Sequence, residues 1–551
     1  MRRNTLTRSV VCSLAAVPAL PVGALADHHA ETQDWWKDAV FYEVFVRSFA
    51  DSTEGPLAGD GVGDIPGLIE RLDELNDGEP GGNDLGVTAL WLMPIAQSPS
   101  YHGYDVVDYT QIDDEYGTNH DFKRLIAECE KRGMRVIVDL VLNHCSNEHP
   151  WFTKAASSKD DPYHDWFVWN DEKPDWTDNL HMWHDHAKDD TGAYYFGFFW
   201  HGMPDLNYDN PFVSAAAYDI SRTWLEDMGA HGFRLDAIRH LIERDGVVAT
   251  TPETIAWLED YHRYLRSVDA ECFSVGEIWG PTSEVMQYIP NALDSAFEFQ
   301  LASTIIEGVN SGDGAGLAEH ITRLNESYTE DAPYSTFLTN HDQNRLMSEL
   351  GGVSPKGFEK NKLAASILLT LPGTPFLYYG EEIGMTGTKP DPDLRVPMQW
   401  TADTATAGFT TGEPWRAPNS DTATVNVASQ KPARNSLWRH YQRMVGVRLA
   451  EPALRRGSIE IVDLGNPALL GYVRTYGDDE LLVIANMSDR TVRDFGVEMD
   501  GFEPGSRVSA EVIAGSGRPR VGRTDDAGMI ADWQPLSRIR GRDVVVLRID
   551  R

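Results

Sequence analysis

Three observations predict an α/β fold in which eight parallel strands close into a barrel. Apolar runs of strand length alternate with helical patterns from Ala39 onward. Eight such runs precede residue 380, and eight is the number of strands in a (β/α)8 barrel. After residue 449 the pattern changes to short alternating runs separated by Gly-Asp turns, which predicts a separate β-sandwich at the C-terminus.

The predicted barrel strands are apolar segments bounded by polar or turn residues. The run 135–142 is almost continuously apolar, as expected for a parallel strand that is covered on both faces. Between the first two strands, Ile65, Leu68, Ile69, Leu72 and Leu75 follow the spacing of one helix face. In chain order we expect strands at 40–46, 87–93, 135–142, 232–236, 273–277, 295–299, 336–340 and 375–379.

Two segments fall outside the alternating pattern. About sixty residues between Asn143 and Asp205 are rich in Trp, His and Asp and lack periodicity; so long an excursion is usually functional, and it predicts an inserted domain at the barrel rim. The first residues combine arginines, a short apolar stretch and Ala24-Leu25-Ala26, which predicts a cleavable signal peptide. The expected division is 1–26 signal peptide, 27–143 barrel domain A (first part), 144–204 domain B, 205–449 barrel domain A (second part) and 450–551 domain C.

Charge restricts the partners of this chain. The formal net charge is -37, with 12 Lys beside 36 Arg, so nucleic acid and anionic membrane are excluded as partners. Abundant acid with little Lys predicts adaptation to high salt, although a merely acidic exported protein is the alternative. No run reaches transmembrane length, and we expect a monomer that is secreted or periplasmic. The three cysteines beyond the signal peptide, Cys129, Cys145 and Cys272, do not form a disulfide framework by their spacing, which leaves one pair open.

Three carboxylates stand at the ends of predicted strands, in Asp236, Glu277 and Asp342. Glycoside hydrolysis needs such a set, because one carboxylate must attack or stabilise while another carboxyl group protonates the leaving oxygen. Arg234 lies two residues before Asp236, so both side chains share one face of the strand. A cation there is expected to lower the pKa of Asp236 and keep it ionised.

Five motifs carry a resemblance to a known family. They are Asp139-Leu-Val-Leu-Asn143-His144, Met203-Pro-Asp205-Leu-Asn207, Gly232-Phe-Arg234-Leu-Asp236, Gly276-Glu277 and Asn340-His341-Asp342. With them the chain resembles the α-amylase superfamily, glycoside hydrolase family 13, over essentially its whole length after the signal peptide. The Met-Pro-Asp-Leu-Asn form is typical of an intermediate group of bacterial α-amylases.

The resemblance implies a role for each matching residue. Asp236 corresponds to the nucleophile, Glu277 to the general acid/base and Asp342 to the third carboxylate that grips substrate hydroxyls. The sugar in subsite −1 would meet an aromatic platform and two histidines, and a basic pair would contact sugar on the leaving-group side. The implied substrate-binding residues are Tyr104, His144, Arg234, His341, Arg239 and His240.

The resemblance also implies Ca2+ at one or two sites. Asn143, Asp205 and the backbone carbonyl of His240 match positions that hold calcium between the barrel and the long rim loop, and such oxygen ligands suit this hard ion. A second candidate is the acidic loop of Asp51, Asp60, Val62 and Asp64. Its inserted residues 53–59 put occupancy in doubt, and for both sites an acidic, solvated turn is the alternative.

The sequence favours one activity within the family and leaves others open. The Ser100-Tyr101-His102 stretch resembles endo-acting enzymes, whereas 395–400 resembles the exo-acting group. We therefore expect a retaining α-amylase that hydrolyses internal α-1,4 bonds of starch and maltooligosaccharides by double displacement. An exo-acting α-glucosidase and a 4-α-glucanotransferase are the alternatives, and a catalytically inactive glucan-binding barrel is the alternative that is not an enzyme.

Overall fold

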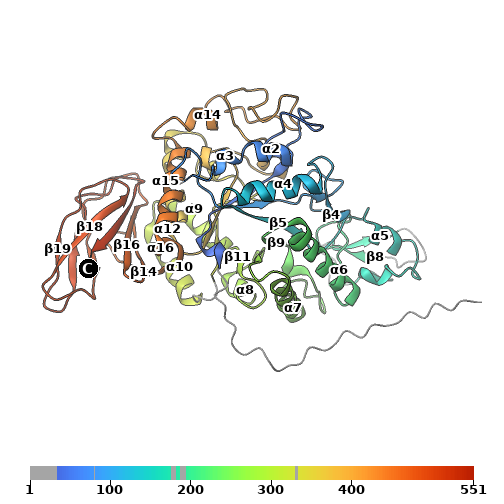
Figure 1. The fold of residues 1–551 in the computed structure, drawn as a ribbon. Coiled ribbons are helices and arrows are strands. Elements are labelled where there is room, and N and C mark those ends of the chain that lie inside the picture. Colours follow the sequence, from blue (N-terminus) through green and yellow to red (C-terminus); the bar gives the residue numbers. More distant parts are fainter. Residues whose placement is uncertain (1–33, 80, 175–180, 187–193, 329–332, 551) are drawn as a thin grey trace, which may run out of the picture. The chain divides into compact units, whose positions relative to one another are not determined.

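The computed structural model describes residues 34–550, except 80, 175–180, 187–193 and 329–332. The predicted signal peptide, 1–26, lies outside these residues. Eight strands form one sheet in the order β11-β10-β9-β5-β2-β1-β13-β12, and their paired neighbours run parallel. Figure 1 labels β5, β9 and β11 of this sheet. The strands are β1 (Phe41–Val44), β2 (Ala89–Leu92), β5 (Arg135–Val141), β9 (Gly232–Asp236), β10 (Phe273–Gly276), β11 (Ser295–Ala296), β12 (Ser335–Thr336) and β13 (Thr374–Tyr378).

The two outer strands of this sheet meet and close it. Phe297, directly after β11, forms a parallel bridge with Ser335 of β12, and the backbone N–H of Glu298 donates to the Ser335 carbonyl at 3.0 Å. The predicted (β/α)8 barrel is thereby confirmed. The strands expected at 295–299 and 336–340 were predicted too long. Helix α9 already begins at Phe299, and strand β12 ends at Thr336.

Helices cover the outside of the barrel (Figure 1). The single helix expected from Ile65 to Leu75 is two short helices that break at Arg71, whose guanidinium lies 4.7 Å above the ring of Trp400. The helices around the barrel are α1 (Val46–Phe49), α2 (Ile65–Glu70), α3 (Leu72–Leu75), α4 (Asn119–Glu130), α6 (Pro211–Arg222), α7 (Pro252–Val268), α8 (Thr282–Val285), α9 (Phe299–Ser311), α10 (Gly314–Ser327), α11 (Leu346–Glu349), α12 (Pro355–Thr370), α13 (Asp391–Leu394), α14 (Val427–Gln430), α15 (Leu437–Ala450) and α16 (Pro452–Arg456).

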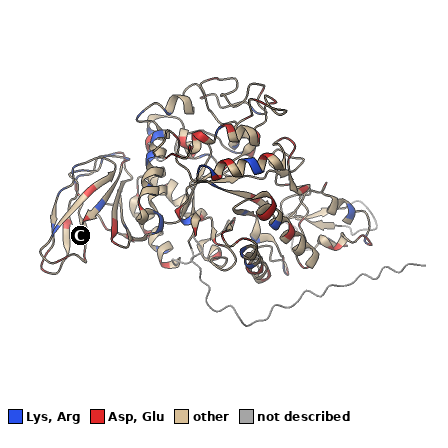
Figure 2. Ribbon diagram, viewed as in Figure 1, with Lys and Arg blue, Asp and Glu red and all other residues tan. Residues whose placement is uncertain are grey.

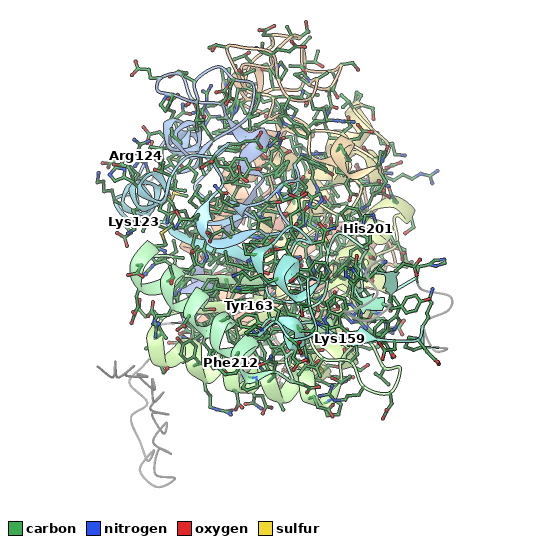
Figure 3. All side chains as sticks on the ribbon, turned by 90° about the vertical axis from the view of Figure 1, so that its right-hand side faces the viewer. Lys123, Arg124, Lys159, Tyr163, His201 and Phe212 are labelled. Atoms are coloured by element: carbon green, nitrogen blue, oxygen red, sulfur yellow. The ribbon has the colours of Figure 1, made fainter. Side chains whose placement is uncertain are left out.

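The long excursion after β5 has structure of its own. It contains helix α5 (Pro150–Ala155) and a three-stranded antiparallel sheet in the order β6-β8-β7. Lys159, Tyr163 and His201 mark it in Figure 3. Its end returns to the barrel through an antiparallel bridge between His144 and Asp205. The strands are β6 (Trp169–Asn170), β7 (Trp183–Asp185) and β8 (Tyr194–Phe196), and a hairpin of β3 (Ala96–Gln97) and β4 (Asp108–Ile112) precedes β5.

The C-terminal part is an antiparallel β structure, as predicted. A six-stranded sheet has the order β14-β15-β16-β21-β18-β19, and β17 pairs with β20 beside it. One face of the larger sheet packs on the barrel helices through residues such as Tyr472 and Val483, and the other face shares a second core with Val497 and Trp533. The strands are β14 (Ser458–Ile461), β15 (Leu469–Tyr476), β16 (Asp479–Asn486), β17 (Val497–Met499), β18 (Arg507–Ala514), β19 (Gly522–Arg523), β20 (Ile530–Trp533) and β21 (Val544–Asp550).

Acidic residues are spread over the barrel helices and the C-terminal sheet rather than gathered in one tract (Figure 2). Among the residues with a described structure, no helix is both long and apolar enough to cross a membrane. Cys129, Cys145 and Cys272 are all buried and unpaired, so the disulfide that the sequence left open does not form among them.

Candidate active site

Arg234 is the centre of the site. It lies on β9 with 1% of its surface exposed, and its Nη1 donates to Asp236 Oδ1 at 2.6 Å and to Asp139 Oδ1 at 2.8 Å. Its Nη2 lies 2.9 Å from Oε2 of Glu277. Neighbouring strands β5, β9 and β10 supply these residues, and the carboxyl ends of parallel strands meet at one rim of a barrel. The inward face predicted for Arg234 and Asp236 is therefore present.

The expected low pKa of Asp236 is wrong for the free site. Burial raises the pKa of Asp236 well above its ordinary value, and the nearby charges of Glu277 and Asp139 raise it further. Arg234 lowers it, but that cation is shared among three carboxylates. Burial favours the neutral carboxyl form of Asp236, because an unpaired charge is costly in a buried place. Arg234 is the cation that opposes this effect and favours the ionised form.

A strained turn follows Asp236 and holds Glu277. Ala237 has φ 50° and ψ 24°, a left-handed conformation that is uncommon for residues other than glycine. In this conformation its backbone N–H donates to Glu277 Oε2 at 3.0 Å. Strain of this kind persists where the surrounding structure over-determines it, often at active sites. The Glu277 side chain keeps 14% of its surface exposed, so it can reach a bound molecule.

Asp342 belongs to a second set of contacts, joined to the first by Tyr104. Arg395 Nη2 binds Asp342 Oδ1 at 2.7 Å, and His341 Nε2 lies 3.2 Å from Oδ2. The Tyr104 hydroxyl lies 2.6 Å from the same Nε2 and donates to Asp139 Oδ2 at 3.0 Å. Burial alone would raise the pKa of Asp342, but His341 and Arg395 hold it far below its usual range. Asp342 is therefore an ionised carboxylate with 28% of its side chain exposed.

Three further residues predicted to bind substrate, His144, His240 and Arg239, differ in their contacts. His144 is buried beside Tyr104, with Nε2 3.1 Å from the Tyr104 carbonyl, and burial lowers the pKa of His144 to about 3, so it is neutral. His240 stacks on Phe198 with ring centroids 3.7 Å apart, and burial lowers its pKa to about 4. Arg239 pairs with Glu284 at 2.6 Å; none of the contacts described for Arg239 reaches the three carboxylates.

The first predicted calcium position offers oxygen atoms without partners. Asn143 Oδ1 and Asp205 Oδ2 are buried and lack a hydrogen-bond partner, and so does Oε1 of Glu243. Burial and the nearby Glu243 raise the pKa of Asp205 well above its ordinary value, whereas hydrogen bonds from the Phe198 backbone N–H and the Asn143 side chain lower it. Because buried anionic oxygens are costly unless paired or metal-bound, these residues fit a hard cation such as calcium.

The second predicted calcium loop does not fit a metal equally well. Asp51 accepts hydrogen bonds from the backbone N–H groups of Gly59 and Gly61, each at 2.9 Å. Asp64 caps helix α2 by accepting from Gly67 N at 2.7 Å and also binds Ser52. Asp60 accepts from Val62 N, at 2.9 Å. Protein donors thus already bind Asp51, Asp64 and one oxygen of Asp60, and calcium at this loop stays a prediction.

Sequence reasoning missed several residues of the site. Glu43 on β1 is 1% exposed, and its Oε1 accepts from His341 Nδ1 at 2.6 Å. The sequence indicated Asp139 only as the first residue of a motif, without a role of its own. In the structure, Trp91 Nε1 donates to Asp139 Oδ2 at 3.3 Å. Arg395 was seen only in a specificity motif. A buried acid in an apolar strand was the available signal for Glu43, since such groups are rarely buried without a partner.

Comparison with known proteins agrees with this geometry. The model of the α-amylase catalytic domain matches residues 43–457. Alpha-amylase 3 of Dictyoglomus thermophilum is 40% identical over 465 residues, covering 84% of this chain and 87% of that protein. The oligo-1,6-glucosidase of Halalkalibacterium halodurans is 32% identical over 529 residues, covering 84% and 91%. The crystal structure of an α-amylase from H. orenii has a TM-score of 0.79 at 35% identity, covering 93% of this chain and all of that one. This chain therefore belongs to the α-amylase family, glycoside hydrolase family 13.

Proposed function

We propose that this glycoside hydrolase is an α-amylase that cleaves internal α-1,4 bonds of starch and maltooligosaccharides with retention of configuration. The observation that carries the proposal is the pair of carboxylates on one guanidinium: Arg234 binds Asp236 through Nη1 and Glu277 through Nη2. Retaining enzymes hold their two carboxyl groups about 5–5.5 Å apart, whereas inverting enzymes need about 6.5–9.5 Å. Two carboxylates separated by a single guanidinium favour the retaining case.

The reaction then has two steps. Asp236 attacks the anomeric carbon and forms a glycosyl ester, while Glu277 gives its proton to the glycosidic oxygen of the departing glucan. Glu277, now ionised, takes a proton from water as that water attacks the same carbon and releases Asp236. Asp342, held ionised by Arg395 and His341, is placed to accept hydrogen bonds from sugar hydroxyls throughout.

The endo preference rests on the residues before Tyr104. His102 occupies the place where exo-acting relatives carry an Asp, so this position supplies no carboxylate to close the site around a chain end. The exo alternative is favoured by Arg395, whose motif resembles the exo-acting group and which binds Asp342 at 2.7 Å. A relative named oligo-1,6-glucosidase is 32% identical, and exo action remains the second candidate.

Chromatography of the products from an end-blocked maltooligosaccharide tests this choice. Internal cleavage of the blocked substrate supports an α-amylase. Cleavage that begins only after the blocking group is removed assigns the chain to the exo-acting group. A linear maltooligosaccharide of equal length without the block serves as the control for activity of the preparation.

Four accompanying properties are part of the proposal. Calcium, held by Asn143, Asp205 and the His240 carbonyl, would tie the rim excursion to the barrel, and the unpartnered oxygens of the first two residues support it. Export by the leader over 1–26 would place the enzyme in the periplasm or the medium, where glucan polymers are met. The net charge of -37 supports function at high salt. The enzyme would act as a monomer.

A further inference from the structure

Glu43 is a buried acid that the reaction described above does not use. It lies on β1 between Trp91 of β2 and Tyr378 of β13, its register partners, and 1% of its surface is exposed. A carboxylate in such a place is rarely found without a partner. Its partner is His341, whose Nδ1 donates to Glu43 Oε1 at 2.6 Å.

The two ring nitrogens of His341 face acceptors on opposite sides. Nδ1 meets Glu43 and Nε2 meets Asp342 Oδ2 at 3.2 Å, with the Tyr104 hydroxyl 2.6 Å from Nε2. A neutral imidazole has one N–H and satisfies one such carboxylate, whereas an imidazolium donates to both. His341 is fully buried, so its charge depends on these neighbours rather than on water.

We propose that Glu43 is a positioning residue for glycoside hydrolysis: through His341 Nδ1 it keeps the imidazole doubly protonated, so that Nε2–H stays directed at Asp342 and the sugar. This inference rests on the proposed function, because it assumes a glucan bound beside Asp342. Glu43 touches neither substrate nor reacting atoms and acts only through His341. With Glu43 in place, a deprotonated His341 keeps its remaining proton on Nδ1, and the lone pair of Nε2 then faces the Asp342 carboxylate.

The charges around His341 support this assignment. Asp342 and Glu43 raise the pKa of His341 to about 9, although burial acts to lower it. Burial raises the pKa of Glu43, and the imidazolium opposes that rise. The other groups that face this pair are the Tyr104 hydroxyl, Asp139 and Arg234 across the site, the buried Tyr378 and Glu381 beside Glu43, and Arg395, whose Nε donates to the His341 carbonyl at 3.0 Å. Trp91 packs edge-on against the imidazole and carries no charge.

The folded-state pKa of His341 lies above its ordinary value, so the doubly protonated form is present below about pH 9 and is lost as the pH rises through that value. Replacing Glu43 by Gln removes the anionic partner but keeps shape and hydrogen bonding. Loss of an opposite charge at this distance lowers such a pKa by about 1–3 units.

The test is the affinity for maltoheptaose, measured by calorimetry from pH 5.5 to 10 in a Glu277→Gln background. This background stops turnover and removes the titration of the general acid. We expect affinity to fall about tenfold or more as the pH passes through about 9, and Glu43→Gln to move this step down by about 1–3 units or to abolish it. A step that stays at the same pH in Glu43→Gln overturns the proposal.

Two variants make the result specific. Glu298→Gln is the matched control, because Glu298 is equally buried but accepts from Thr282 and Tyr328 instead of a histidine; its step should stay in place. His341→Gln should remove the step even if Glu43→Gln fails to fold, and a step that survives His341→Gln also overturns the proposal. Absence of maltoheptaose binding at pH 6 in Glu277→Gln alone would instead overturn the proposed function, and this inference with it.

Discussion

Replacement of Glu277 by Gln separates chemistry from structure at this site. Gln cannot give a proton to the glycosidic oxygen, and general acid catalysis is worth about 10²–10⁴-fold in rate. We therefore expect kcat on maltoheptaose to fall by that factor, which corresponds to about 3–5 kcal/mol in the barrier. The fold should be retained, since the Gln carbonyl can accept the two hydrogen bonds that Arg234 and Ala237 give to Oε2.

The assay compares two substrates. On an aryl maltooligosaccharide with an acidic phenol as leaving group, which departs without protonation, the first step of Glu277→Gln should be much closer to that of the unaltered enzyme. Glu298→Gln is the control, because Glu298 is a buried carboxylate that accepts from Thr282 and Tyr328, outside the three carboxylates, and it should retain its turnover. Near-normal turnover of maltoheptaose by Glu277→Gln, or an equal loss on both substrates, would refute the acid role.

Three other outcomes are expected. Activity and folding should persist in molar NaCl, because screening shortens the reach of the -37 net charge to about 3 Å at 1 M; loss of the near-UV circular dichroism signal above seawater salinity would contradict this. Calcium should raise the Tm of the EDTA-treated enzyme, and Asp205→Asn should reduce that rise, since Oδ2 of Asp205 is buried without a partner; an equal rise in both would remove Asp205 from the cation site. Arg474→Met should lower the free energy of unfolding by about 2–4 kcal/mol in urea, because Arg474 donates to the carbonyls of Thr370, Gly457 and Ser458, whereas exposed Arg493→Met should leave it nearly unchanged.

Local sequence signals were enough to predict the barrel and the C-terminal sheet. Buried parallel strands such as β5 read as continuous apolar runs, and the outer helices carry one apolar face. The lengths of β11 and β12 were not predictable, because the bridge between Phe297 and Ser335 is a contact between distant segments. The break at Arg71 is likewise tied to a ring supplied by Trp400, far along the chain.

For the site, motifs identified residues but not their charges. The sequence placed Arg234 beside Asp236 correctly, yet it indicated a lowered pKa, because it contained the cation and not the burial or the competing carboxylates. Glu43 pairs with His341 across 298 positions of the chain, and no spacing rule reaches so far. The acidic loop at Asp51 suggests a metal by its sequence alone, and the backbone N–H groups of Gly59 and Gly61 that bind this carboxylate were not evident from the sequence.

Trapping of the glycosyl-enzyme intermediate tests the central claim most directly. The enzyme would be incubated with a 5-fluoro maltosyl fluoride of α configuration, which forms the glycosyl ester quickly and releases it slowly, and then digested and analysed by mass spectrometry. One maltosyl adduct on the Asp236 carboxylate, in the peptide that contains Gly232 to Asp236, is the predicted result. An adduct on another residue, or turnover of the fluoride with inversion and without any adduct, would contradict the account.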